Sequence, residues 1–153
     1  MRIGLAAILV FIIPSAIDAQ MTKVEQKAIM DRAIELHDIS QRFVEAEKEG
    51  DQASISAITL PNASFLDESW NSTPLNSSSI TNLAKNCSPI YGTDPEIISG
   101  RVSLPRDKQS IFWQCPQAVT ASPVKTIIEY SGDKIAFVRD IAGLSAPMVV
   151  APR

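Results

Sequence analysis

The chain has 153 residues, a formal net charge of −3 and only two cysteines. It contains no basic run, so it lacks the positive surface that contacts with nucleic-acid phosphates require. After the first residues, no basic amphipathic stretch favours a helix lying on a membrane surface, and the length fits one globular domain.

The first 19 residues have the three-part layout of a secretory leader. Arg2 precedes an apolar run of about eleven residues that ends at Pro14, and Ala19 provides a small residue for cleavage before Gln20. This run is too short for a membrane span, which needs about 20 apolar residues. An uncleaved membrane anchor is the alternative. We therefore predict a signal peptide over 1–19 and export to the bacterial periplasm or the extracellular space, with no stable membrane association after cleavage.

Export changes how Cys87 and Cys115 are interpreted. In an oxidising compartment an even number of cysteines is read as paired, and this pair encloses 27 residues. Closing a loop of that size stabilises a fold by about 3–4 kcal/mol. The alternatives are a thiol nucleophile or a metal pair, but His37 is the only histidine, and a metal site needs three or four such ligands. We predict a Cys87–Cys115 disulfide, no metal and no cofactor.

The first half of the chain has helical periodicity. Apolar side chains recur on one stripe of a helix predicted over 21–49, and Gly50 is placed to end it. A short second helix follows over 52–58, and then a strand over 62–67. A third helix is predicted over 77–87, with Cys87 on its apolar face.

After Cys87 the pattern changes to the alternation of strands. We expect a loop over 88–96 and a loose tail over 142–153. Three stretches alternate or are rich in β-branched and aromatic residues, and the last of them forms a hairpin around Gly132. These predicted strands cover 98–104, 111–115, and 124–130 with 135–141. The expected fold is a single α+β domain over 20–141, with N-terminal helices packed on a curved antiparallel sheet.

Two segments carry a family resemblance. Residues 43–51, followed by Ile55, Ile58 and residues 60–65, and the ending 126–138, resemble the nuclear transport factor 2-like superfamily, which includes ketosteroid isomerase-like, SnoaL-like and scytalone dehydratase-like proteins. The resemblance implies a cone-like roll, in which a curved sheet wraps a long first helix and leaves a pocket at its open end. It also implies association into a homodimer through the sheet.

The resemblance directs attention to three polar side chains. Ketosteroid isomerase-like members use a carboxylate from the neighbourhood of Asp67 and Glu68 as general base, and a useful base there has a pKa raised by burial. The surrounding serines and asparagine instead favour a solvated loop. Dehydratase-like members use pocket histidines, so His37 is a third candidate, with a place at the edge of the core as its alternative.

Five aromatic residues are candidates for lining a pocket, although strand aromatics also build plain cores. Trp70 stands apart in a polar segment, where it either covers the open end as a lid, marks a contact surface or packs on a helix. The candidates are Phe43, Trp70, Trp113, Tyr130 and Phe137.

Three asparagines fit the acceptor pattern for N-linked glycans. They are in Asn62-Ala63-Ser64, Asn71-Ser72-Thr73 and Asn76-Ser77-Ser78. Because the short leader and the family resemblance suggest a bacterial protein, we interpret them as chance matches in a serine-rich and asparagine-rich segment.

The sequence thus predicts an exported, non-catalytic domain that binds a small apolar or amphipathic ligand or a partner protein. One alternative is a lyase or isomerase of the ketosteroid isomerase-like type, with Asp67 or Glu68 as general base. The other is a structural or dimerisation module.

Overall fold

The computed structural model describes residues 23–76, 78–93, 96–98, 101–103, 107–120, 122–143 and 149–150. The predicted leader lies outside these residues, and so does the predicted tail beyond Gly143 except for Val149–Val150. Three helices are described, namely α1 (Lys23–Glu49), α2 (Gln52–Ile58) and α3 (Thr81–Asn86). No helix in this described part is both long and apolar enough to cross a membrane.

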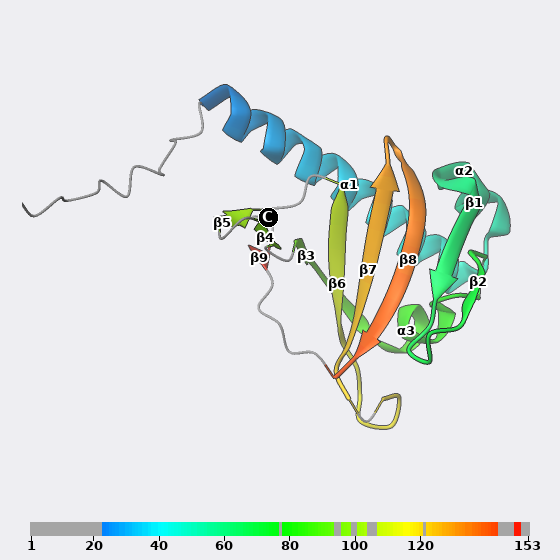
Figure 1. Cartoon of the computed structure of the whole chain (residues 1–153). Helices are drawn as coiled ribbons and strands as arrows, with labels where there is room; N and C mark the ends of the chain where they lie inside the picture. Colours follow the sequence, from blue (N-terminus) through cyan, green and yellow to red (C-terminus); the bar gives the residue numbers. More distant parts are fainter. Residues whose placement is uncertain are drawn as a thin grey trace, which may run out of the picture.

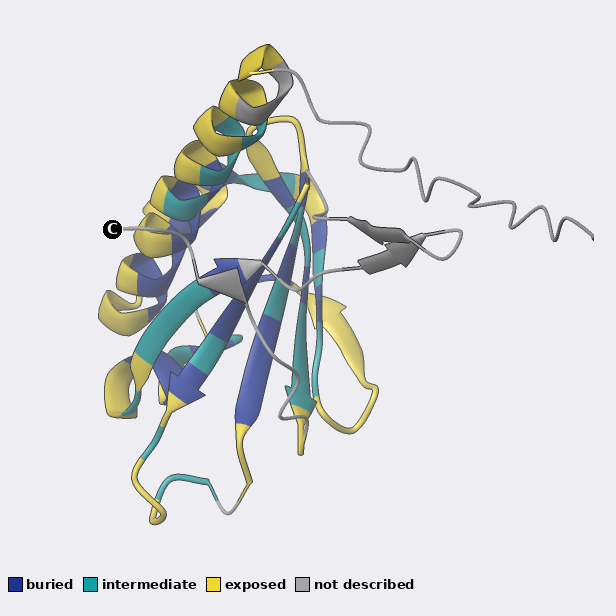
Figure 2. Ribbon diagram, turned by 90° about the vertical axis from the view of Figure 1, so that its left-hand side faces the viewer, coloured by how far each residue is buried: buried dark blue, intermediate teal, exposed yellow. Residues whose placement is uncertain are grey.

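Helix α1 packs its C-terminal half against the sheet, because apolar side chains repeat there at helical spacing. Leu36, Phe43 and Val44 are buried, while Met30 and Ile34 nearer the N-terminus are exposed. Figure 2 shows this contrast along the helix, whose first turns carry mostly exposed residues and extend away from the strands.

The turn between α1 and α2 follows the predicted chemistry. Gly50 adopts a φ of 73°, a left-handed conformation that glycine enters without steric cost. Asp51 then caps α2 by accepting hydrogen bonds from the backbone N–H groups of Ala53 and Ser54, at 3.0 and 3.1 Å. Gly50 and Asp51 thus end α1 and begin α2 before the chain enters β1.

Nine strands are described, seven of them in one sheet of order β2-β1-β8-β7-β6-β3-β9 (Figure 1). Their bounds are β1 (Thr59–Leu66), β2 (Ser72–Pro74), β3 (Ser88–Thr93), β4 (Glu96–Ile98), β5 (Arg101–Ser103), β6 (Lys108–Gln114), β7 (Val124–Ser131), β8 (Lys134–Ala142) and β9 (Val149–Val150). Strands β4 and β5 form a separate two-stranded pair. The predicted α+β class is confirmed, with helices preceding most of a curved sheet.

The sheet differs from the prediction in one pairing. Strand β1 runs parallel to β8, whereas the other described strand pairs of this sheet are antiparallel. The sheet is therefore mixed. A parallel neighbour joins strands that are far apart in sequence, and no local turn signal reports such a contact.

Several predicted boundaries were wrong. The segment predicted as a loop over 88–96 begins with β3, which pairs with the aromatic strand β6 from Ser88 opposite Gln114 to Gly92 opposite Ser110. Pro89 and Gly92 are turn formers by local propensity, but pairing with β6 outweighs that preference. In place of the single strand predicted over 98–104, the structure describes β4 and β5, which pair antiparallel, and within the predicted tail β9 pairs with β3.

The core lies between α1 and the concave face of the sheet. Phe43 of α1, Ile111 and Trp113 of β6, Ile128 of β7 and Val138 of β8 are all buried at 2% exposure or less. Burying side chains of this kind stabilises the fold by about 1.5–3 kcal/mol each. This packing holds the strands from which the site described below projects.

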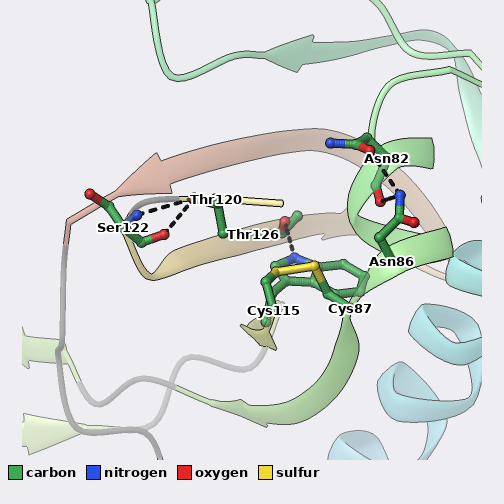
Figure 3. Close-up of a disulfide and its surroundings, with 8 residues drawn as sticks. Asn82, Asn86, Cys87, Cys115, Thr120, Ser122 and Thr126 are labelled. Atoms are coloured by element: carbon green, nitrogen blue, oxygen red, sulfur yellow. Dashed lines mark hydrogen bonds between the residues drawn. A yellow bond between two sulfur atoms is a disulfide. The ribbon is translucent and has the colours of Figure 1, made fainter. Parts of the chain in front are cut away.

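The predicted Cys87–Cys115 disulfide is present. Cys87 follows α3 directly, and Cys115 follows β6, so the bridge joins the end of the helix to the end of a strand. Figure 3 shows it beside Asn82 and Asn86 of α3. The helix is shorter than predicted and ends one residue before Cys87.

Candidate functional site

A cavity of about 420 Å³ opens at the end of the sheet where β1 and β8 finish. Residues of α3 and of the loop between β6 and β7 contribute to its lining, and both segments lie near this end of the sheet in Figure 1. Its lining mixes apolar, hydroxyl-bearing and acidic side chains, namely Phe65, Asp67, Glu68, Ser69, Ser78, Ser79, Ile80, Asn82, Leu83, Val119, Thr120, Val124 and Asp140. None of these described lining residues is a lysine, arginine or histidine.

Asp140 of β8 supplies a half-buried acid to the cavity. Its Oδ1 accepts a hydrogen bond of 2.5 Å from the hydroxyl of Thr126, its cross-strand partner on β7. The Thr126 hydroxyl oxygen in turn accepts a bond of 2.8 Å from the indole N–H of the buried Trp113. The three side chains therefore form one oriented chain from the core to the cavity.

Burial raises the pKa of Asp140 to about 7. The Thr126 hydrogen bond opposes this rise because it favours the carboxylate, while the negative charges of Glu68, Glu47 and Asp67 add to it. Desolvation outweighs the single hydrogen bond. The Asp140 carboxyl can therefore gain or lose a proton near neutral pH.

Asp67, at the rim of the same cavity, has the opposite environment. Its Oδ1 accepts bonds from the backbone N–H groups of Ser69 and Asn71, at 2.9 and 2.8 Å, and its Oδ2 accepts from the Asn71 amide at 3.1 Å. These bonds hold the pKa of Asp67 below its usual value. Such a carboxylate shapes a turn, whereas the predicted general base requires a raised pKa.

The turn beyond Asp67 carries two of the predicted residues. Glu68 lines the cavity and is exposed. Trp70 is 75% exposed and has a φ of 64°, the one described non-glycine residue in the left-handed region. Its indole therefore stands in solvent beside the rim.

Glu47 of α1 holds the start of α3, the helix that contributes to the wall of the cavity. Although it is 0% exposed, its Oε2 accepts bonds from the backbone N–H of Ile80 and the hydroxyl of Thr81, at 3.3 and 3.0 Å. Ile80, the N-cap residue of α3, makes no capping bond with its own side chain, so Glu47 provides that cap from another helix. Burial raises the pKa of Glu47 to about 7.

The remaining predicted residues lie elsewhere. His37 is half-buried and meets the Tyr91 ring edge-on, with the ring centroids 4.8 Å apart. Among the five aromatic candidates, Phe43, Trp113 and Tyr130 are buried in the core and Phe137 is half-buried. None of the five lines the cavity itself, although Trp113 is linked to it through Thr126 and Asp140.

Sequence reasoning missed Asp140, Thr126 and Glu47. A charged residue within a β-branched strand and a glutamate beside the apolar stripe of α1 were the available signals, and both also fit solvated faces. Within the described part of the chain, no group of three or more His, Cys, Asp or Glu side chains is placed to hold a metal ion.

Solved structures resemble this fold at low sequence identity. An NTF2-like protein of unknown function from Mesorhizobium loti is 13% identical, with a TM-score of 0.49 over 74% of this chain and 95% of that one. A candidate polyketide cyclase from Sinorhizobium meliloti is 18% identical, with a TM-score of 0.44 over 71% and 97%. A protein with a ketosteroid isomerase-like fold from Catenulispora acidiphila, in complex with trimethylamine, is 10% identical, with a TM-score of 0.35 over 71% and 87%.

These neighbours are of the NTF2-like kind that the sequence resemblance names. At such identities and scores the likeness concerns the fold alone. No family model matches the chain, and no curated protein matches it.

Proposed function

We propose that the chain binds a small amphipathic molecule in the cavity between α3 and the ends of β1 and β8. The observation that carries this proposal is the composition of the wall, which pairs apolar side chains with acids and has no described cationic lining residue. A volume of about 420 Å³ lies within the usual range for small-molecule sites, about 300–1,000 Å³.

The two chemical surfaces of the cavity define the ligand. Phe65, Leu83 and Val124 present an apolar surface for a hydrocarbon body. Asp140 faces the same space and is held by Thr126. A ligand with an ammonium or other strongly donating end would pair with the Asp140 carboxylate and favour its ionised form.

Three fluorescent probes of matched size test this proposal. A dansyl group is joined by one alkyl chain to an ammonium, a neutral amide or a carboxylate, and each probe is titrated with the mature protein. We expect the ammonium probe to bind most tightly, and Asp140→Asn to weaken it about tenfold, equivalent to about 1.4 kcal/mol.

The matched control is Asp31→Asn, which removes an exposed acid of α1 that pairs with Lys27 and should leave the affinity unchanged. Equal affinities for the three probes, or an ammonium affinity that is unaffected by Asp140→Asn, would contradict the proposal.

The second candidate function is proton transfer, and one observation favours it. The pKa of Asp140 near 7 suits a general acid or base at neutral pH, because proton exchange is most effective when the pKa lies close to the working pH. The lyase or isomerase alternative then assigns the base to Asp140. Asp67 remains a rim residue whose lowered pKa makes it a weak base.

A simple proton-abstraction reaction distinguishes binding from catalysis. 5-Nitrobenzisoxazole opens to a coloured phenolate when a base removes its carbon-bound proton and the nitrogen–oxygen bond breaks. A catalytic Asp140 gives a rate that rises through pH 7 and is lost in Asp140→Asn but retained in Asp67→Asn. A rate equal to that of free acetate at every pH would exclude this second function.

Export and dimerisation remain parts of the proposal. The leader-like segment supports an exported location, and the family resemblance supports a homodimer. N-terminal sequencing of the secreted chain and sedimentation of the mature protein test these two predictions.

A further inference from the structure

We propose that the chain carries N-linked glycans on the surface around the β1–β2 edge and at the end of α3. The whole sequence contains five asparagines, and four begin an acceptor triplet. Besides the three triplets at Asn62, Asn71 and Asn76, the fourth is Asn86-Cys87-Ser88. Only Asn82, followed by Leu83 and Ala84, lies outside the pattern.

The frequency of these triplets argues against chance. Serine and threonine make up 24 of 153 residues, so about one of five asparagines should precede them at the right spacing. Within residues 62–88 serine and threonine make up 9 of 27 residues, and fewer than two of the five asparagines would begin a triplet by chance. Four matches therefore revise the interpretation of the triplets as coincidence.

Exposure meets the physical requirement for a bulky modification. All four acceptor asparagines are exposed, and a glycan is accommodated only at the surface. The Asn71 amide nitrogen also donates to Asp67 at 3.1 Å. A glycan replaces one of the two amide hydrogens, so the other N–H can maintain that contact and the turn it supports.

Three acceptors surround the outer edge of the sheet. Strand β2 pairs with β1 only over Ser64–Leu66, so Asn62 lies beyond the part of β1 that β2 covers. Asn71 directly precedes β2, and Asn76 follows it by two residues. Figure 1 shows β1 and β2 together at one side of the sheet.

Such an edge gains from a glycan. An exposed edge strand presents unpaired backbone groups that can pair with another chain, and all three residues of β2 are exposed. Hydrophilic glycans on both sides of β2 would keep a second strand away. Asn86 is separate from this group, because it lies at the end of α3 beside the disulfide (Figure 3).

The covalent step needs a lipid-pyrophosphate-linked oligosaccharide as donor. The asparagine Nδ2 bonds to the first carbon of the sugar, and the bond from that carbon to the pyrophosphate oxygen breaks. The amide gives up one proton, and the lipid pyrophosphate leaves with the bonding electrons. This step occurs in a eukaryotic secretory pathway, so the proposal selects the extracellular over the periplasmic location and is independent of the cavity's function.

The full chain, with its own leader, is expressed in cultured insect cells to test the proposal. The secreted protein is treated with peptide N-glycosidase in heavy-oxygen water, which converts each glycosylated asparagine into a labelled aspartate. We expect loss of mass on gels and heavy-oxygen labels at Asn62, Asn71, Asn76 and Asn86. A secreted chain without enzyme-sensitive mass, or a chain that never enters the secretory pathway, overturns the proposal.

Substitutions supply the matched controls. Each of Asn62→Gln, Asn71→Gln, Asn76→Gln and Asn86→Gln should remove the mobility step belonging to that position. Asn82→Gln makes the same chemical change at an exposed position of α3 outside any triplet, and it should leave the mobility unchanged. A mobility step that Asn82→Gln abolishes, or that survives all four triplet substitutions together, contradicts the assignment.

Discussion

The cavity has an aspartate at its rim, Asp67, and another at its floor, Asp140, and the two lie in opposite environments. At the rim, Asp67 is surrounded by donors and solvent, and its pKa lies below the usual value. At the floor, Asp140 has one described hydrogen bond, from Thr126, and burial raises its pKa to about 7. The number of donors and the loss of water decide which aspartate can exchange a proton at neutral pH.

The two tryptophans repeat this contrast. Trp113 is 2% exposed and donates to Thr126 beneath the floor, whereas Trp70 is 75% exposed beside the rim. The floor therefore rests on the packed core through Thr126 and Trp113, and the rim is a hydrogen-bonded turn. Substitutions at the floor should affect stability and the rim should tolerate change.

The largest expected difference comes from the tryptophans. Trp113→Ala leaves a cavity under Thr126 and should lower the free energy of unfolding by about 3–5 kcal/mol. Trp70→Ala removes no buried contact and should change it by less than about 0.5 kcal/mol. Urea unfolding measures both. Equal losses for the two variants would show that the rim is packed as tightly as the floor.

The next effect concerns pH and Asp140. A pKa that is higher in the folded state, about 7 against a reference value of 3.8, means that the folded chain binds more protons than the unfolded chain between these values. Stability from this group is therefore present at low pH and lost as the pH rises through about 7. At pH 8, Asp140→Asn should raise the free energy of unfolding by up to about 4 kcal/mol.

Asp67→Asn is the control for that experiment. The pKa of Asp67 is lowered, so its contribution is present above the ordinary aspartate value and is lost only as the pH falls below it. The pH dependence between 5 and 8 should therefore persist in Asp67→Asn and weaken in Asp140→Asn. The opposite result would exchange the roles of rim and floor.

Removal of the disulfide should lower the free energy of unfolding by about 3–4 kcal/mol. The bridge ties α3 to the end of β6, and α3 is the wall that shields the floor. The double variant Cys87→Ser/Cys115→Ser should lose that stability and should not respond to reductant, whereas the wild type should. If the reduced wild type unfolds at the same urea concentration as the oxidised protein, the bridge does not anchor the wall.

Ionisation of Glu47, which caps α3 from α1, should change the free energy of unfolding by about 3 kcal/mol. Its pKa rises from 4.5 to about 7 on folding, so ionisation at pH 8 costs stability that is present at pH 5. Glu47→Gln retains an oxygen acceptor for Ile80 and Thr81 and should gain stability at pH 8. The exposed Glu35→Gln is the control, and equal gains in both variants would contradict the burial argument.

Local patterns predicted the elements that depend on nearby residues. The stripe on α1, Gly50 and the Gly132 hairpin each act within one element or turn, and they are present in the structure. Strand β3 and the parallel β1–β8 pair depend on distant strands. Their pairing cannot be deduced from Pro89, Gly92 or any other local signal.

The floor was unpredictable for a specific geometric reason. The hairpin begins with Ser131 opposite Lys134, and a regular ladder from that turn would bring Thr126 opposite Arg139. A bulge between Glu129 and Tyr130 shifts the register by one residue, so Thr126 faces Asp140 instead. The polar chain from Trp113 to Asp140 therefore depends on one irregularity that the turn sequence does not announce.

One measurement tests the contrast between rim and floor most directly. The carbon resonances of the Asp140 and Asp67 carboxyl groups can be followed by NMR in one sample from acid to pH 9. We predict a midpoint near 7 for Asp140 and a midpoint below the ordinary aspartate value for Asp67. Midpoints that coincide in the ordinary acidic range would contradict the account.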